Sequence, residues 1–277
     1  MVPAIRVLFV LAGLAFAAGG EAASPPPDPV LQGNFVQGGL VLGRVVAGAV
    51  VKLDGRFVNV GRDGRFVFGF GRDAPPRATL EVVFPDGRTV VREIAVRQRA
   101  YEIQRIDWLP PRMVTPPPEV LARIEEEGAA IRAARAGFTE PAGFGISFIW
   151  PAKGRISGVY GSQRILNGEP RQPHLGVDVA APVGTPVVAA AEGTVTLAEN
   201  DLYYTGGTVI VDHGHGLSTV YSHLSAVTAK LGRKVKQGEV IGKLGKTGRA
   251  TGAHLDWRLN WFQERLDPAL VVGPMRD

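Results

Sequence analysis

The chain has 277 residues, 45% of them hydrophobic and 21% charged, a globular composition with enough length for two domains. Its net charge of +5 comes from basic residues spread along the chain, which argues against a nucleic-acid partner and suits an anionic polymer such as the cell wall. The chain has no cysteine, so it has no disulfides, and any zinc site must be built from nitrogen and oxygen ligands.

The first 23 residues have the pattern of an export signal. Arg6 precedes an apolar run from Val7 to Ala18, and small residues follow up to Ala23. This pattern predicts a secretory signal peptide over 1–23, and therefore a protein of the periplasm or cell envelope. The run is too short to cross a bilayer comfortably, so we expect no membrane span after signal cleavage.

Residues 24–110 read as short strands separated by turns. Asp54-Gly55, Asp63-Gly64 and Asp86-Gly87 are turn signals between β-rich runs. The spacing predicts a small immunoglobulin-like β-sandwich that serves as an accessory domain, as a spacer or docking module. The predicted strands are Arg56–Val60, Arg65–Phe70, Leu80–Phe84 and Thr89–Val96.

Residues 111–143 are predicted to form a Pro-rich linker and a connecting helix. Thr115 can cap a helix that is entered through prolines, and Gly137 can end it. A partial apolar stripe indicates packing on one or both domains. The stripe consists of Val120, Leu121, Ile124 and Ile131.

Residues 144–277 are β-rich and glycine-dense, which predicts an antiparallel β domain with a groove. A polar segment from Arg164 to Pro173 is expected to be a loop beside the site. The predicted strands are Val187–Ala191, Thr194–Ala198, Gly207–Val211, Ser218–His223 and Val240–Leu244.

All five histidines fall in this last segment, and three of them accompany two aspartates. A catalytic zinc site needs three protein ligands, an open position for water, and a group that moves protons. His174, Asp178 and Asp256 could supply nitrogen and oxygen ligands. His223 and His254 would then remain for proton transfer and charge stabilisation.

Alternation along two strands predicts which side chains share a face, because successive strand residues point to opposite sides. His254, Asp256, Arg258 and Asn260 alternate with bulky apolar residues, which predicts a polar face on the last strand. By the same rule Tyr221 and His223 would share a face, although packing is the expected role of Tyr221. The remaining histidines, His213 and His215, are expected to be structural or to lie at the rim of the site.

The segment from Trp150 to about Arg265 resembles the lysostaphin-type (LytM-type) zinc endopeptidases that cleave peptidoglycan peptides. The resemblance implies that His174 and Asp178 bind Zn²⁺ and that His223 and His254 are the catalytic pair. The matching stretches, in the order of the family, are His174-Leu-Gly-Val-Asp178 with the residues to Pro186, Tyr221-Ser-His223-Leu, Val235-Lys-Gln-Gly-Glu-Val-Ile-Gly242, Thr247-Gly248 and Gly252-Ala-His254-Leu.

The chain departs from the family at the third zinc ligand. The family ends its site in His-x-His, whereas this chain has Asp256 at the second histidine. Asp256 could bind zinc itself, the site could be degenerate, or it could hold a different metal. Many family members have Glu where this chain has Arg258. The family therefore pairs a histidine ligand with a glutamate, and this chain would pair a carboxylate ligand, Asp256, with an arginine.

The function implied by the resemblance is zinc-dependent hydrolysis of stem or crosslink peptide bonds in peptidoglycan. The alternative is a catalytically degenerate domain that binds peptidoglycan or activates a cell-wall amidase. The expected partners are therefore peptidoglycan and, in the alternative, another cell-wall hydrolase.

Overall fold

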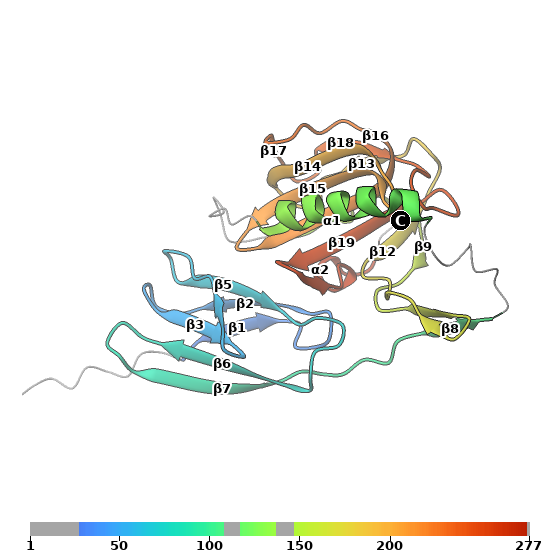
Figure 1. Ribbon diagram of the computed structural model, residues 1–277. Helices are drawn as coiled ribbons and strands as arrows, with labels where there is room; N and C mark the ends of the chain where they lie inside the picture. Colours follow the sequence, from blue (N-terminus) through green and yellow to red (C-terminus); the bar gives the residue numbers. More distant parts are fainter. Residues whose placement is uncertain (1–27, 108–116, 137–146, 276–277) are drawn as a thin grey trace, which may run out of the picture.

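The structure, a computed structural model, comprises an N-terminal β module, the helix α1 and a C-terminal β domain (Figure 1). The predicted mostly-β fold class is confirmed. The predicted signal peptide and the domain boundaries at 110/111 and 143/144 lie outside the described residues. Within the described part of the chain, no helix has the length and apolar character needed to cross a bilayer. The structure describes residues 28–107, 117–136 and 147–275.

The N-terminal module consists of two antiparallel sheets, with strand orders β1-β2-β5 and β4-β3-β6-β7. Phe66 and Phe68 of the first sheet and Leu80 and Val82 of the second are fully buried in one apolar cluster. The predicted Asp-Gly turns connect β3 to β4, β4 to β5 and β6 to β7. The strands are β1 (Val30–Gly33), β2 (Leu40–Arg44), β3 (Val50–Leu53), β4 (Arg56–Val58), β5 (Arg65–Gly69), β6 (Arg77–Val83) and β7 (Thr89–Ala95).

The connecting helix is α1 (Leu121–Ala136), which lies across β14 and β15 of the C-terminal domain (Figure 1). The predicted apolar stripe is used in part. Ile131 packs on the domain, but Leu121 is 51% exposed. Polar contacts hold the middle of the helix instead, since the Tyr203 N–H donates to the Glu127 carboxylate at 2.7 Å.

The C-terminal domain is built on an antiparallel sheet with strand order β17-β14-β15-β16-β19-β12-β9. Strand β18 pairs with β13 and β16, and β20 pairs with β19. Tyr221 of β16 lies directly opposite Trp257 of β19, and both are fully buried. The elements of this domain are β9 (Arg155–Gly158), β12 (Val177–Ala180), β13 (Pro186–Val188), β14 (Gly193–Leu202), β15 (Gly206–Gly214), β16 (Leu217–Val227), β17 (Lys234–Val235), β18 (Val240–Leu244), β19 (Leu255–Trp261), β20 (Glu264–Leu266) and the short helix α2 (Ala269–Val272). A 3-10 turn (Pro118–Val120) precedes α1.

The segment predicted as a polar loop forms a hairpin instead. Strands β10 (Gln163–Leu166) and β11 (Glu169–Pro170) pair with each other, and β10 also pairs in parallel with β8 (Ile103–Ile106). A polar sequence can form such strands because backbone hydrogen bonds, rather than a buried apolar face, provide the pairing. The chain leaving the N-terminal module therefore contributes a strand to the hairpin that precedes His174.

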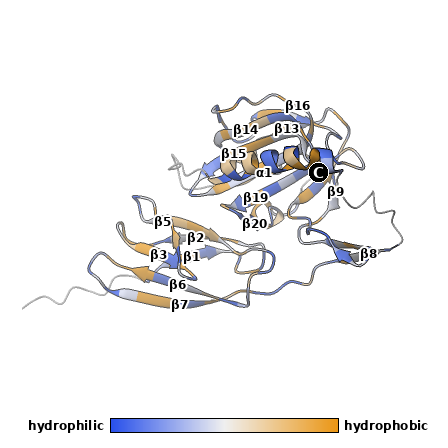
Figure 2. Ribbon diagram, viewed as in Figure 1, coloured by the Kyte–Doolittle hydropathy of each residue, from blue (hydrophilic) through white to orange (hydrophobic). Residues whose placement is uncertain are grey.

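The N-terminal module packs directly on the C-terminal domain. A Cβ added at Gly69 would lie 2.5 Å from the side chain of Leu266, which is fully buried. The Arg99 guanidinium donates to the Asp267 carboxylate at 2.8 Å, and the Asp267 N–H donates to the Gly38 carbonyl at 2.8 Å. Apolar residues of the two units belong to one cluster, and both units carry hydrophobic strand segments (Figure 2).

Candidate functional site

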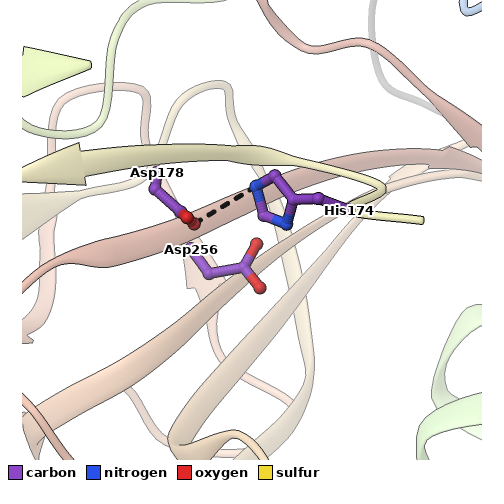
Figure 3. A group of neighbouring side chains, drawn as sticks. All are labelled: His174, Asp178 and Asp256. Atoms are coloured by element: carbon purple, nitrogen blue, oxygen red, sulfur yellow. Dashed lines mark ion pairs between the residues drawn. The ribbon is translucent and has the colours of Figure 1, made fainter. Parts of the chain in front are cut away.

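His174, Asp178 and Asp256 converge in the C-terminal domain (Figure 3). One potential ligand atom from each lies within 4.8 Å of the others. Asp178 on β12 and Asp256 on β19 are direct partners in the strand register, so their side chains emerge on one face of the sheet. His174 comes from the segment just before β12. The structure thus brings together the three residues that the sequence analysis named as possible ligands.

Two polar atoms of this cluster are buried and lack a hydrogen-bond partner among the described residues. They are Nε2 of His174 and Oδ1 of Asp178, which lie 3.2 Å apart without hydrogen-bond geometry. Unpaired buried polar atoms are unfavourable. A divalent metal between the three residues would satisfy both atoms, and one imidazole nitrogen with two carboxylates is a suitable donor set.

Asp256 is held by Arg258, its neighbour on the same strand face. The Arg258 Nε donates to Asp256 Oδ1 at 3.0 Å, and Nη2 donates to Oδ2 at 2.5 Å. Burial acts to raise the pKa of Asp256, but the charge and hydrogen bonds of Arg258 outweigh it and lower the pKa to about 2. Asp256 is therefore an anion at neutral pH, and its charge is balanced by the guanidinium.

Two glycines make room for the carboxylates. A Cβ at Gly158 would lie 2.8 Å from the carboxyl carbon of Asp178 and closer still to its Oδ2. A Cβ at Gly176 would lie 2.7 Å from Asp256 Oδ1 and 2.6 Å from Arg258 Cγ. The cluster therefore depends on the absence of side chains at positions 158 and 176.

The imidazoles of His223 and His254 lie side by side, with ring centroids 4.7 Å apart. Each Nδ1 donates to a backbone carbonyl at 2.9 Å, His223 to Thr247 and His254 to Gly252. A carbonyl can only accept, so Nδ1 carries the proton and Nε2 is left for the site. The Nε2 of His254 lies 3.8 Å from Oδ1 of Asp178. Burial is the main cause of the lowered pKa of His223, which is neutral at pH 7.

The expectation that Tyr221 and His223 share a face is wrong. Ser222 is the residue of β16 opposite Asp256, whereas Tyr221 lies opposite Trp257 in the core, where its hydroxyl accepts from a backbone N–H. His223 has a left-handed φ of 65°, which breaks the alternation of the strand and turns its ring toward His254. The packing role expected of Tyr221 is confirmed.

The other two histidines lie away from this cluster. His213 is buried, and its Nδ1 donates to the Glu192 carbonyl at 2.6 Å while Nε2 lies 2.8 Å from the Thr219 hydroxyl. Burial lowers the pKa of His213 to about 4. His215 Nδ1 lies 3.3 Å from the Asn59 carbonyl of the N-terminal module. The structural role expected for both residues agrees with these contacts.

Backbone contacts hold His174 in place. Its carbonyl accepts from the Gly161 N–H at 2.7 Å, and its N–H donates to the Ser162 carbonyl at 2.8 Å. The Gly161 carbonyl in turn accepts from Nε of Arg72, in the N-terminal module, at 2.9 Å. Arg72 was not predictable as a functional residue, because a single arginine after a strand has no distinctive spacing.

Thr247 is a second residue whose role was missed, although it lies in a matching stretch. Its hydroxyl donates to the Leu224 carbonyl at 2.8 Å and accepts from the Gly207 N–H at 2.9 Å, which positions the Thr247 carbonyl that orients His223. The Thr247-Gly248 stretch was the available signal, and Gly248 has a left-handed φ of 65°.

The C-terminal domain is similar to known peptidases. Residues 172–268 match the model of Peptidase family M23. The chain is 41% identical over 109 residues to peptidoglycan DD-endopeptidase ShyA of Vibrio cholerae, which covers 39% of this chain and 25% of that protein. It is 34% identical over 161 residues to cell division protein DipM of Caulobacter vibrioides, and this match covers 58% of this chain and 25% of that protein. The chain spans about a quarter of the length of these curated relatives. A crystal structure of a candidate peptidase M23 from Pseudomonas aeruginosa is 32% identical, covers 87% of this chain and 96% of that chain, and has a TM-score of 0.68.

Proposed function

The chain belongs to peptidase family M23, and from this premise we propose that it is a zinc-dependent endopeptidase acting on peptide bonds of peptidoglycan in the cell envelope. The convergence of His174, Asp178 and Asp256, with buried unpaired atoms on the first two, carries the proposal. The names of relatives that are peptidoglycan DD-endopeptidases support the substrate class.

In this proposal His174 Nε2 and one carboxylate oxygen each from Asp178 and Asp256 hold the zinc. A bound zinc supplies Lewis acidity, which polarises the scissile carbonyl and makes water more acidic. Arg258 keeps Asp256 ionised and fixes the direction of its carboxylate. Because two carboxylates neutralise more of the metal charge than one, the chemistry should be slower than with a His-Asp-His set.

His223 and His254 move and hold protons in this scheme. We assign the base to His223, because its lowered pKa keeps Nε2 unprotonated at pH 7 and able to take a proton from the attacking water. His254 presents Nε2 to the same space and would stabilise the developing oxyanion. The carbonyls of Thr247 and Gly252 fix both ring orientations before substrate arrives.

The alternative is a domain that has lost catalysis and that binds peptidoglycan or activates a cell-wall amidase. One observation favours it: both oxygens of Asp256 accept hydrogen bonds from Arg258, which competes with a metal for their lone pairs. A carboxylate oxygen has two lone pairs, so coordination and the arginine contact are compatible. Metal content separates the two functions.

The test compares the zinc content and the cleavage of crosslinked peptidoglycan peptides by the wild type, Asp256→Ala and Asp256→His. The proposed function predicts about one zinc per chain in the wild type, loss of zinc and cleavage in Asp256→Ala, and retention in Asp256→His. A wild type without zinc, joined by an Asp256→His variant that binds it, would instead support the non-catalytic alternative.

A further inference from the structure

A cavity of about 530 Å³ lies between the N-terminal module and the C-terminal domain, next to the candidate site. Pro173 and Leu175, the two chain neighbours of His174, line it from the C-terminal domain. The segment from Gly69 to Pro75 lines it from the N-terminal module, and Arg265 of β20 lines it beside them. The cavity therefore begins one residue away from a proposed metal ligand.

Arg265 stands on the same sheet face as the metal cluster. It lies directly opposite Asn260 of β19 in the strand register. Asn260 is two residues from Arg258 and four from Asp256, so the three side chains point to the same face of the strand. Four residues of strand separate Asn260 from Asp256, which corresponds to about 13 Å. Asn260 is itself fully buried, so Arg265 is the residue of this pair that lines the cavity. A peptide that reaches from the cavity to the metal cluster would have to cover this distance, which about four extended residues can do.

Arg265 is a partly buried cation without a carboxylate partner among the described residues. Its Nη1 donates to Asn260 Oδ1 at 2.6 Å, and burial lowers its pKa to about 10, so it stays charged at neutral pH. The other two arginines of the cavity have carboxylate partners: Arg72 lies 2.6 Å from Asp73, and Arg56 lies 3.5 Å from Glu264. Partial burial makes a charge less favourable when it has no counterion, so Arg265 has the character of an anion-binding group.

We propose that this interdomain cavity is a substrate subsite in which Arg265 binds a free carboxylate of the peptide, about four extended residues from the bond that is cut. The inference rests on the proposed peptidase function and adds a specificity element to it. Arg265 offers planar, bidentate donors that match a carboxylate. Asn260 orients the guanidinium through its side-chain oxygen, while its own amide lies 3.3 Å from the Ser218 carbonyl.

The test uses two crosslinked stem-peptide dimers that differ in one respect: the carboxylates of one are free and those of the other are amidated. Binding of both to metal-free protein is measured by calorimetry, and KM and kcat are measured with the zinc-loaded protein. The wild type should bind the free acid at least about tenfold more tightly. Arg265→Gln should remove this preference through KM with kcat unchanged, and Arg265→Lys should keep part of it.

Arg56→Gln is the matched control, because Arg56 lines the same cavity but is exposed and paired with Glu264. It should bind both peptides like the wild type. Equal loss in Arg56→Gln and Arg265→Gln, or equal binding of both peptides by the wild type, would overturn the inference. If no peptide is cleaved, the proposed function fails while the calorimetry still decides the subsite; cleavage without a carboxylate preference rejects the subsite alone.

Discussion

Replacing Gly158 with alanine should displace Asp178 and weaken metal binding. The added Cβ would lie 2.8 Å from the Asp178 carboxyl carbon, whereas ordinary contacts begin at 3.4 Å. The carboxylate must therefore move by about 0.6 Å or more. Displacements of this order at a metal or catalytic centre reduce affinity or rate by roughly tenfold to a hundredfold. We expect the zinc dissociation constant of Gly158→Ala to rise by that factor, with cleavage falling in parallel.

Gly252→Ala provides the matched control. Gly252 also lies beside the site, since its carbonyl accepts from His254, but a Cβ there would meet nothing within 4 Å. Zinc affinity is measured by competition with a chromogenic chelator, and folding is checked by thermal unfolding in a chelator. Wild-type zinc affinity in Gly158→Ala, or an equal loss in Gly252→Ala, would refute the role given to the space beside Asp178.

Three further predictions concern charge and packing. His213→Gln should remove an acid-induced loss of stability of about 3 kcal/mol. The pKa of His213 is about 4 in the folded protein and 6.5 in the unfolded chain, so the wild type should lose this stability as the pH falls from 6.5 toward 4. Denaturant unfolding at each pH measures the loss in the wild type and its absence in the variant. Arg258→Gln should weaken zinc binding by roughly tenfold to a hundredfold, because Asp256 loses the arginine that orients its carboxylate. Unchanged zinc affinity in a chelator competition would contradict the role given to Arg258. Leu266→Ala should destabilise the protein by about 2–5 kcal/mol in urea unfolding, since it opens a cavity against Gly69; a change below about 1 kcal/mol would mean that the two units are not packed together.

Much of the site was predictable because it depends on strand alternation. The two-residue period of β19 places Asp256 and Arg258 on one face, and the structure pairs them. The same rule failed at His223, where a left-handed residue interrupts the period. Residues other than glycine adopt that conformation in few places, and no local pattern marks this one, so the direction of the His223 ring depends on tertiary contacts such as the one to Thr247.

The fold was predictable to a similar extent. Turn signals and β-rich runs located β4 to β7 and several strands of the C-terminal domain, because local turn chemistry is independent of distant parts of the chain. The strands β1 to β3 were not predicted. The hairpin of β10 and β11 was missed, since its pairing with β8 joins segments about 60 residues apart and leaves no local pattern. The two glycines beside the carboxylates were equally hidden, because their importance appears once the strands are assembled.

The contact from Arg72 through Gly161 to His174 changes what counts as the catalytic unit. His174, the proposed metal ligand, is supported by strand β8, which pairs with the hairpin that precedes His174, and by Arg72 of the N-terminal module. A C-terminal fragment cut at the edge of the family match would keep every reactive side chain and lose the scaffold of one of them. Natural recombination that exchanged the N-terminal module would consequently change the position of His174 as well as the accessory module itself.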